Sequence, residues 1–234
     1  MRFIEHIVEP KRLLLAWQSS DERYRTRYIV AELRRISDET TLVYLPETKD
    51  FIQAKNIGFD AYPAFRDTNK IHHNVQDAFM RRLLPRSRGD FTHYLERLRL
   101  KPELKISDFA LMGYSGAKLL SDGFSLIHPF DDIAGPCEFL TEVAGFRHIP
   151  SNDKNALNVG NIVTFSQEFN QTVQEEAISV KAGGIHIGYI NRCLVPTFSK
   201  LLSEKTSMSA WIEKLNGTQD KPVVYFFVEI KPKI

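Results

Sequence analysis

The apolar positions in the first half of the chain follow two patterns, short runs typical of strands and a four-residue spacing typical of a helix. Short runs rich in β-branched and aromatic residues, which are typical of strands, occupy residues 13–17, 28–33, 41–45 and 123–127. Before the last run, Val75, Phe79 and Leu83 stand four residues apart, which predicts one face of a helix over 75–84. Two more helices are predicted, one from Asp90 and one over 107–112. The first half therefore predicts a small mixed α/β domain.

From Thr141 onward, the pattern is almost entirely one of short strands. Short strands are expected over residues 141–148, 162–168, 177–180, 185–190, 208–215 and 223–230. A single helix is predicted over 195–202, because Phe198, Leu201 and Leu202 have core spacing. Many short strands with one inserted helix are typical of a small, partly open barrel of the OB or SH3 kind. The fold class expected for the whole chain is α+β.

A boundary between the two halves is predicted near residues 129–136, where Pro, Gly and paired Asp occur together. We expect one domain over 1–130, a linker over 131–140 and a second domain over 141–234. The charge changes at the same place. Residues 1–130 contain 21 Lys and Arg against 17 Asp and Glu, and the remainder contains 10 against 12. Any non-specific attraction for phosphate would therefore come from the first half.

Composition places the chain among ordinary globular proteins, with 43% hydrophobic and 26% charged residues in 234. No apolar run approaches the ~20 residues of a membrane span, so no membrane partner is expected. Residues 1–6 lack the features of a signal peptide. Cys137 and Cys193 have no CxxC spacing, which favours reduced thiols and a cytoplasmic location.

Arginines are concentrated between the predicted helices of the first half. Arg86 and Arg88 flank a single serine, and such guanidinium groups suit phosphate. We take both as candidate nucleic-acid contacts, and Arg81 and Arg82 as candidate contacts with an acidic protein partner. The alternative is a solvated helix face whose arginines pair with Asp90 and Glu96.

Residues 175–192, EEAISVKAGGIHIGYINR, predict a hairpin in the second half. Two alternating strands flank the Gly183-Gly184 pair, which accepts the positive φ of a tight turn. Gly188 interrupts the second strand, so we expect a bulge or a close approach of another strand there.

The end of this hairpin, Gly-Tyr-Ile-Asn-Arg, raises the question of a ligand. Tyr189 and Ile190 must point to opposite sides of a strand, so one of them faces the core. Arg192 could meet a phosphate, or it could pair with Glu175 or Glu176.

Several motifs of the second half occur in a recognisable order. They are VAGFRH (143–148), LNVGNIV (157–163), EFN (168–170), AISV (177–180), GIHIGYINR (184–192) and the leucine pair at 201–202. This order, and the Gly-Tyr-Ile-x-Arg element above all, resembles the HIRAN domain over residues 141–232. The resemblance implies a modified OB-like barrel. Some members of that family, fused to DNA-remodelling helicases, grip the 3′ end of single-stranded DNA.

The resemblance also implies which residues would contact DNA. Arg147 falls where the family has a basic residue facing the nucleotides, and His148 replaces an aromatic residue that stacks on a base. Tyr189 and Arg192 complete the expected nucleic-acid-binding set.

One loop departs from the family pattern. Val173 stands in place of a stacking tyrosine, and Gln174 stands in place of an aspartate that accepts from the terminal hydroxyl. Glu175 and Glu176 add negative charge beside the expected phosphate path. This loop argues against inherited recognition of a 3′ end.

The first half resembles the N-terminal subdomain of HipA-type toxin kinases over residues 12–130. The motifs that support this lie, in order, at 30–33, 44–47, 83–85, 108–113 and 121–127. That subdomain contains none of the phosphoryl-transfer residues, and no kinase motif follows here. The resemblance implies an accessory piece that docks a separately encoded HipA-like kinase.

No catalytic or cofactor motif is evident in the sequence. The seven histidines are scattered without metal-ligand spacing, and Tyr114-Ser115-Gly116 lacks the first glycine of a nucleophile elbow. We therefore expect no enzyme, no metal and no cofactor. Two hypotheses remain. The first is a DNA-binding accessory protein in bacterial defence or a toxin–antitoxin system, and the second is an antitoxin-like module that regulates a HipA-like kinase.

Overall fold

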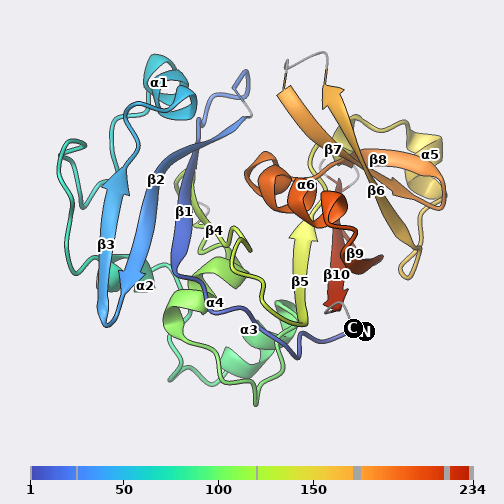
Figure 1. Ribbon diagram of the computed structural model, residues 1–234, viewed down its shortest axis with the longest axis horizontal. Helices are drawn as coiled ribbons and strands as arrows, with labels where there is room; N and C mark the ends of the chain where they lie inside the picture. The colour runs from blue at the N-terminus through green and yellow to red at the C-terminus, as the bar shows by residue number, and fades with distance from the viewer. Residues whose placement is uncertain (1, 25, 120, 171–174, 219–221, 232–234) are drawn as a thin grey trace. The chain divides into compact units, whose positions relative to one another are not determined.

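The computed structural model of the chain contains two compact units (Figure 1). It describes residues 2–24, 26–119, 121–170, 175–218 and 222–231. The N-terminal unit consists of Val8–Leu98 and Lys105–Asp132. The C-terminal unit consists of Met1–Ile7, Arg99–Leu104 and Ile133–Ile234. The change of unit after Asp132 lies close to the linker expected from the sequence, but two segments of the first half belong to the C-terminal unit.

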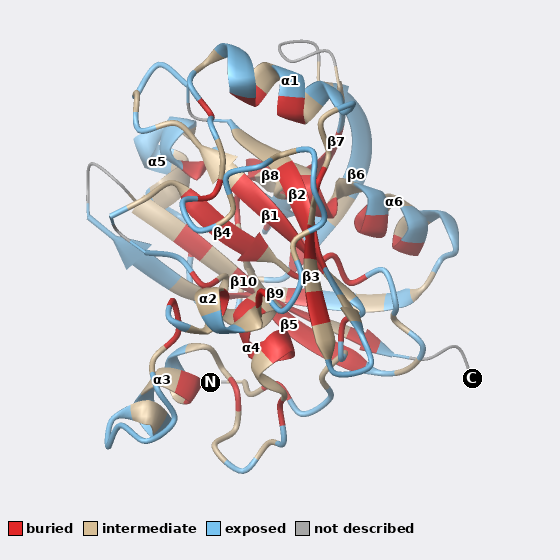
Figure 2. Cartoon of the chain, turned by 90° about the vertical axis from the view of Figure 1, so that its left-hand side faces the viewer, coloured by how far each residue is buried: buried red, intermediate tan, exposed pale blue. Residues whose placement is uncertain are grey.

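The N-terminal unit is built on one antiparallel sheet with the strand order β3-β2-β1-β4. Its strands are β1 (Arg12–Gln18), β2 (Arg27–Ile36), β3 (Glu39–Tyr44) and β4 (Phe124–Ile127). β1 lies in the centre and is buried on both faces over Leu13–Ala16 (red in Figure 2). The four strands expected from the sequence of this half are all present.

Within the described residues of this unit, four helices accompany the sheet, of which the sequence predicted three. They are α1 (Lys49–Asn56), α2 (Gln76–Met80), α3 (Phe91–Arg97) and α4 (Asp108–Ser115). α4 begins as expected, because the Ser107 hydroxyl accepts a hydrogen bond from the Ala110 amide at 3.0 Å. α2 is shorter than the predicted helix and ends before Leu83. α1 was missed because only Phe51 and Ala54 are buried on it, which leaves little apolar periodicity.

An aromatic cluster forms the core between this sheet and its helices. Its members come from three strands, two helices and the connecting loops: Trp17, Tyr44, Phe51, Phe59, Tyr62, Phe65, Phe79 and Phe124. The rings of Tyr62 and Phe79 stack with centroids 4.5 Å apart, and Phe124 meets Tyr62 edge-on at 5.0 Å. Such pairs stabilise a core by about 0.5–1.5 kcal/mol each beyond their buried area.

The C-terminal unit contains two three-stranded antiparallel sheets. One has the order β5-β10-β9, with β5 (Cys137–Glu142), β9 (Ser207–Gly217) and β10 (Pro222–Lys231). The other has the order β6-β7-β8, with β6 (Val163–Asn170), β7 (Glu175–Ala182) and β8 (Ile185–Tyr189). The α+β class is therefore confirmed for the chain.

Isolated β-bridges join these two sheets at both pairs of edges. Ala144, just after β5, bridges to Tyr189 at the end of β8, and Ile162, just before β6, bridges to Trp211 of β9. Over the described residues, the strands remain two sheets and form no continuous closed barrel. Phe165 and Phe198 fill the space between them, with ring centroids 5.0 Å apart.

The first strand of this unit begins earlier than the sequence predicted. Residues 137–140, expected to be linker, are part of β5, and residues 146–148, expected to be strand, form a short 3-10 helix, η1 (Phe146–His148). Gly145 at φ 81° makes the turn into η1.

Short helical elements complete the C-terminal unit. After η1 come α5 (Ser151–Asn155), η2 (Arg192–Leu194) and α6 (Val195–Ser203). α6 is the helix predicted from the spacing of its leucines and Phe198. It buries one face and exposes the other (Figure 2).

Two buried carboxylates hold the segments that join the C-terminal unit from the first half. Glu138 accepts hydrogen bonds from the Glu5 and His6 amides at 3.0 and 2.7 Å. Glu213 accepts from Arg99 Nε at 2.7 Å. Burying either carboxylate without these partners would cost several kcal/mol. The two segments are therefore part of the C-terminal fold, which a chain beginning at residue 141 would lack.

Candidate nucleic-acid interface

Two segments of the C-terminal unit meet where the sequence suggested a ligand. The Ala144 amide donates to the Tyr189 carbonyl at 2.8 Å, and the Tyr189 amide donates to the Ala144 carbonyl at 2.9 Å. This pair of hydrogen bonds brings the start of η1 beside the end of β8. Arg147 and His148 follow one strand of the pair, and Arg192 follows the other.

Gly188 makes this approach possible. A Cβ atom built on it would lie 2.3 Å from the Ala144 carbonyl oxygen, closer than real Cβ contacts occur. Its φ of 132° is also accessible almost exclusively to glycine. The expectation of a close strand approach at this position is confirmed.

A bulge on β8 also matches the expectation for this hairpin. Val180 pairs with Gly188 whereas Lys181 pairs with His186, which leaves Ile187 as the extra residue. At the turn, Gly183 and Gly184 have φ values of 57° and 87°, as a tight hairpin requires.

The Tyr189 side chain is outside the core, whereas Ile190 is 2% exposed and belongs to it. The Tyr189 ring contacts the His186 ring edge-on, with centroids 5.1 Å apart. Desolvation raises the pKa of Tyr189, and a hydrogen bond to the Glu168 carboxylate raises it further. The ring is therefore held by His186 of β8 and Glu168 of β6, with its hydroxyl protonated.

Arg147, His148 and Lys154 form a cluster that we call the cationic rim. Arg147 and His148 are exposed on η1. Arg147 Nε donates to His148 Nε2 at 2.9 Å, which requires the imidazole proton on Nδ1. Lys154 Nζ donates to the Arg147 carbonyl at 2.8 Å and lies over the Phe146 ring at 5.9 Å. Over the described part of the chain, neither Arg147 nor Lys154 pairs with a carboxylate.

Arg192 has a different environment from the rim. Its guanidinium donates to the Glu175 carboxylate at 2.9 Å, and the two side chains are 31% and 30% exposed. Of the alternatives that the sequence left open, pairing with Glu175 is the one observed. Glu175 therefore offsets the charge of Arg192, and the role of Arg192 in binding stays a prediction. Val173 and Gln174, the departures from the HIRAN pattern, lie outside the described residues.

Three of the four arginines singled out in the N-terminal unit pair with carboxylates of that unit. Arg82 is buried, and its guanidinium bonds Asp122 at 2.7 and 2.8 Å and the Ala117 and Phe124 carbonyls at 2.8 and 3.0 Å. The sequence suggested Arg82 as a partner contact. The structure instead makes it an internal clamp, because its side chain is only 4% exposed. Arg81, its neighbour, is exposed.

The two arginines proposed as phosphate contacts in this unit are also paired. Arg86 Nε donates to Asp108 at 2.7 Å, and another of its nitrogens donates to the Ile106 carbonyl at 2.8 Å. Arg88 bonds both carboxylate oxygens of Asp90 at 2.9 Å. Their charges are therefore largely offset locally, although both side chains remain about half exposed.

Lys154 is the rim residue that sequence reasoning missed. It lies in α5, a five-residue helix with no buried residue and no apolar periodicity. Its only sequence signal was its position seven residues after Arg147, within a polar segment.

Two titratable side chains elsewhere in the chain, His128 and Cys137, are buried in the core and have shifted pKa values. Desolvation lowers the pKa of His128 to about 4, and its ring nitrogens bond the Val8 carbonyl and the Phe130 amide. Burial raises the pKa of Cys137 to about 12, and both Cys137 and Cys193 are buried free thiols.

Over the described ranges, no cluster of three or more His, Cys, Asp and Glu could hold a metal ion. No helix among the described residues has the length and hydropathy to cross a membrane.

Comparison with known proteins gives little further information. No family model and no curated protein matches the chain. Among solved structures, the HIRAN domain of human HLTF is similar to 41% of this chain, which covers 78% of that domain with 15% identity and a TM-score of 0.33. The expected likeness to HipA-type kinases finds no support in these comparisons.

Proposed function

We propose that the C-terminal unit binds single-stranded nucleic acid, as a non-catalytic module, through the cationic rim and Tyr189. The observation that carries the proposal is the Ala144–Tyr189 bridge. This bridge joins the segment that carries the exposed Arg147 and the half-buried Lys154, neither of which has a carboxylate partner in the described residues, to an aromatic side chain outside the core.

Single strands suit this surface better than duplexes do. Their bases are accessible, and stacking of one base on an aromatic ring contributes about 1–3 kcal/mol. Arg147 and Lys154 would contact phosphates, and each such contact makes the observed affinity fall with salt. The Tyr189 ring, held by His186 and Glu168, would receive a base.

An OB-like barrel of the HIRAN type fits the architecture on which we place this site. The bridges at Ala144–Tyr189 and Ile162–Trp211 connect both pairs of sheet edges, as a partly open barrel requires. We do not extend the proposal to recognition of a 3′ hydroxyl, because the sequence lacks the loop tyrosine and aspartate that would supply it.

Fluorescence anisotropy with labelled single-stranded, 3′-recessed and duplex DNA tests this proposal across a salt titration. We expect the single strand to bind most tightly. The double variant R147A/K154A should weaken single-strand binding by about tenfold or more. It should also reduce the slope of log affinity against log salt by about 1.4, or about 0.7 per phosphate contact. Tyr189→Leu should weaken binding about fivefold or more with little change in that slope.

The matched control is K200A/K205A, which removes two exposed lysines of the same unit on and after α6. It should change the affinity less than about twofold. The proposal fails if no salt-sensitive binding is seen at low ionic strength, or if the control pair weakens binding as much as the rim pair.

A further inference from the structure

The sheet of β6, β7 and β8 has a polar face on the side away from the core (Figure 1). The opposite face is apolar, since Val163, Val180 and Ile187 are buried there, and Phe198 of α6 packs against Phe165 on that side. The polar side chains alternate with the buried ones along the strands. They are Thr164, Ser166, Glu168, Asn170, Glu175, Ser179, Lys181, His186 and Tyr189. The proposed function uses the tyrosine of this polar face and leaves the rest of it unassigned.

The register of the sheet places Lys181 beside the aromatic side chains of this face. Lys181 lies directly opposite His186, and Ser179 lies directly opposite Tyr189. Residues opposite each other in an antiparallel pair share a face and have Cβ atoms about 4.5–5.5 Å apart. The bulge at Ile187 keeps His186 and Tyr189 on one side, where their rings meet edge-on with centroids 5.1 Å apart. Lys181, His186 and Tyr189 therefore form one continuous surface.

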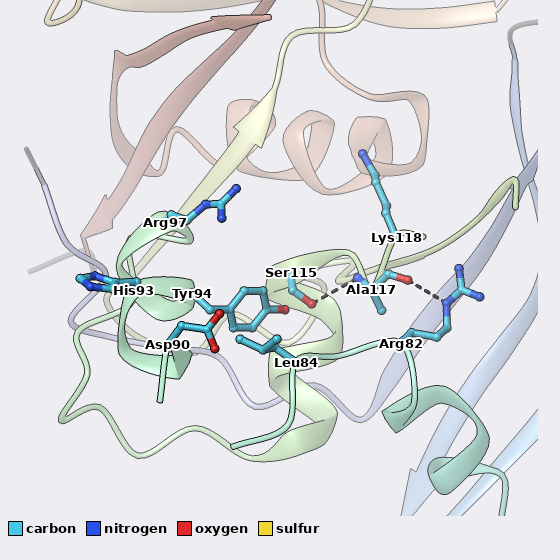
Figure 3. A pocket seen from close by; sticks show the side chains of 9 residues that line it. All are labelled: Arg82, Leu84, Asp90, His93, Tyr94, Arg97, Ser115, Ala117 and Lys118. Atoms are coloured by element: carbon cyan, nitrogen blue, oxygen red, sulfur yellow. Dashed lines mark hydrogen bonds between the residues drawn. The ribbon is translucent and has the colours of Figure 1, made fainter. Parts of the chain in front are cut away.

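Lys181 carries a charge that nothing nearby offsets. Its side chain is exposed, and no carboxylate pairs with its ammonium group among the residues that the structure describes. Arg82, which lines the polar pocket of the N-terminal unit (Figure 3), shows the opposite case, because its guanidinium bonds the Ala117 carbonyl and Asp122. Lys181 is therefore a surface cation of the same kind as those of the cationic rim.

The carboxylates of the polar face lie toward its other end. Glu168 is opposite Ala177, which is four residues before Lys181, or about 13 Å along a strand. A hydrogen bond also joins Glu168 to the Tyr189 hydroxyl, and Glu175 pairs with Arg192 at 2.9 Å. A phosphate beside Lys181 would therefore be remote from both carboxylates.

The rim approaches this part of the polar face from the other side of β8. Because the bridge between Ala144 and Tyr189 is antiparallel, the residues after Ala144 run toward those before Tyr189. η1, which carries Arg147, accordingly contacts β8. His186 and Tyr189 thus lie between the cations of the rim and Lys181.

We infer that Lys181 is a further phosphate contact, so that a bound single strand runs from the cationic rim across Tyr189 and His186 onto β7. This inference rests on the proposed function and extends its site beyond one stacked base. Cations on both sides of an aromatic ring suit a single strand, because its phosphates follow positive charge while its bases stack on exposed rings.

Anisotropy with labelled oligothymidylates of increasing length tests the inference. Wild type should gain affinity with length until the rim, Tyr189 and Lys181 are all engaged, at about four nucleotides or more. Lys181→Ala should weaken binding of an oligomer of about eight nucleotides about threefold, and it should reduce the slope of log affinity against log salt by about 0.7. It should leave the affinity for a dinucleotide within about twofold. Lys181→Arg should restore both the affinity and the slope.

An added cation tests the same path in the opposite direction. Thr164 lies opposite Lys181 on β6, so Thr164→Lys should raise the affinity for the longer oligomer about twofold or more and steepen the salt slope by about 0.7. Gln167→Lys is the matched control, because it adds the same charge to an exposed position on the other face of the same strand. It should change the affinity less than about twofold.

Lys200→Ala is the control for the loss of charge, since Lys200 is exposed on α6, which packs on the apolar face. If R147A/K154A weakens binding but Lys181→Ala changes it no more than Lys200→Ala does, this inference is overturned and the proposed function stands. An equal gain in Thr164→Lys and Gln167→Lys would also overturn it, because net charge would then explain the effect. Absence of salt-sensitive binding by wild type would overturn both.

Discussion

The arginine-rich segment of the N-terminal unit and the cationic rim of the C-terminal unit both contain basic residues, but these residues differ in their partners. Arg82, Arg86 and Arg88 each pair with a carboxylate of their own unit. Arg147 and Lys154 bond to His148 and to a backbone carbonyl instead. Three of the four arginines predicted as contacts in the half with the larger net positive charge are therefore offset by carboxylates, whereas Arg147, in the half with net negative charge, is not.

This difference shows why a charge count along a sequence is a poor guide to a polyanion site. The partner of Arg82 lies 40 residues away and that of Arg86 lies 22 residues away, so a window around each arginine does not contain them. The attraction of a surface for phosphate depends on the carboxylates within a few ångströms of each cation, which the fold decides.

The largest effect that this comparison predicts is at Arg82. Replacing Arg82 with Ala should lower the free energy of unfolding by about 3–5 kcal/mol, because a buried pair loses one member and two carbonyls lose their donor. The neighbouring variant Arg81→Ala changes an exposed side chain and should alter it by about 0.5 kcal/mol at most. Urea denaturation followed by circular dichroism measures both.

A small loss in Arg82→Ala, comparable with that of Arg81→Ala, would show that Arg82 is not a clamp. The prediction from the sequence that Arg82 contacts a protein partner would then be favoured. A large loss confined to Arg82 sharpens the distinction between arginines that hold the fold and cations that remain at the surface.

Much of the fold could be predicted from the sequence wherever the apolar residues followed a clear strand or helix pattern. The runs at 13–17 and 28–33 are strands because their apolar residues are buried on a four-stranded sheet. The strand expected over 141–148 was displaced to Cys137–Glu142, because the apolar alternation continues through Gly145 although the chain turns there.

The candidate site was less predictable than the fold. Arg147, His148, Tyr189 and Arg192 were identified from a motif order, but that order gave no information about ion pairs. Whether Arg192 meets Glu175 or a ligand depends on the register of β7 and β8, in which Ser179 lies opposite Tyr189. Lys154 contributes through a backbone carbonyl, and no sequence pattern encodes such a contact.

A smaller effect is predicted at Gly188, the glycine of β8 that lies against the Ala144 carbonyl. Gly188→Ala should lower the free energy of unfolding by about 2–3 kcal/mol, because its φ of 132° and the Ala144 oxygen both exclude a side chain. It should also weaken single-strand binding by separating the rim from Tyr189. Gly183→Ala is the control, since its φ is 57° but nothing lies within 4 Å; it should cost about 1 kcal/mol.

Equal losses of stability in the two glycine variants would mean that the backbone conformation alone matters at Gly188. Retained DNA affinity in a folded Gly188→Ala protein would separate the rim from Tyr189 as binding elements. Both quantities come from denaturation and anisotropy on the same samples.

The smallest effect is predicted at Glu175, whose carboxylate pairs with Arg192. A substitution there tests whether removing the paired carboxylate turns an arginine into a phosphate contact. Glu175→Gln removes the carboxylate that pairs with Arg192, so the positive charge of the guanidinium should be less offset and attract phosphate more strongly. We expect single-strand affinity to rise about two- to fivefold, by less than ~1 kcal/mol, since the pair is partly exposed to water. The salt slope should steepen by about 0.7.

Glu103→Gln is the control, because it makes the same charge change at an exposed residue of the Arg99–Leu104 segment. If Glu103→Gln raises the single-strand affinity as much as Glu175→Gln does, the change in net charge explains the gain. Arg192 would then not be part of the binding surface.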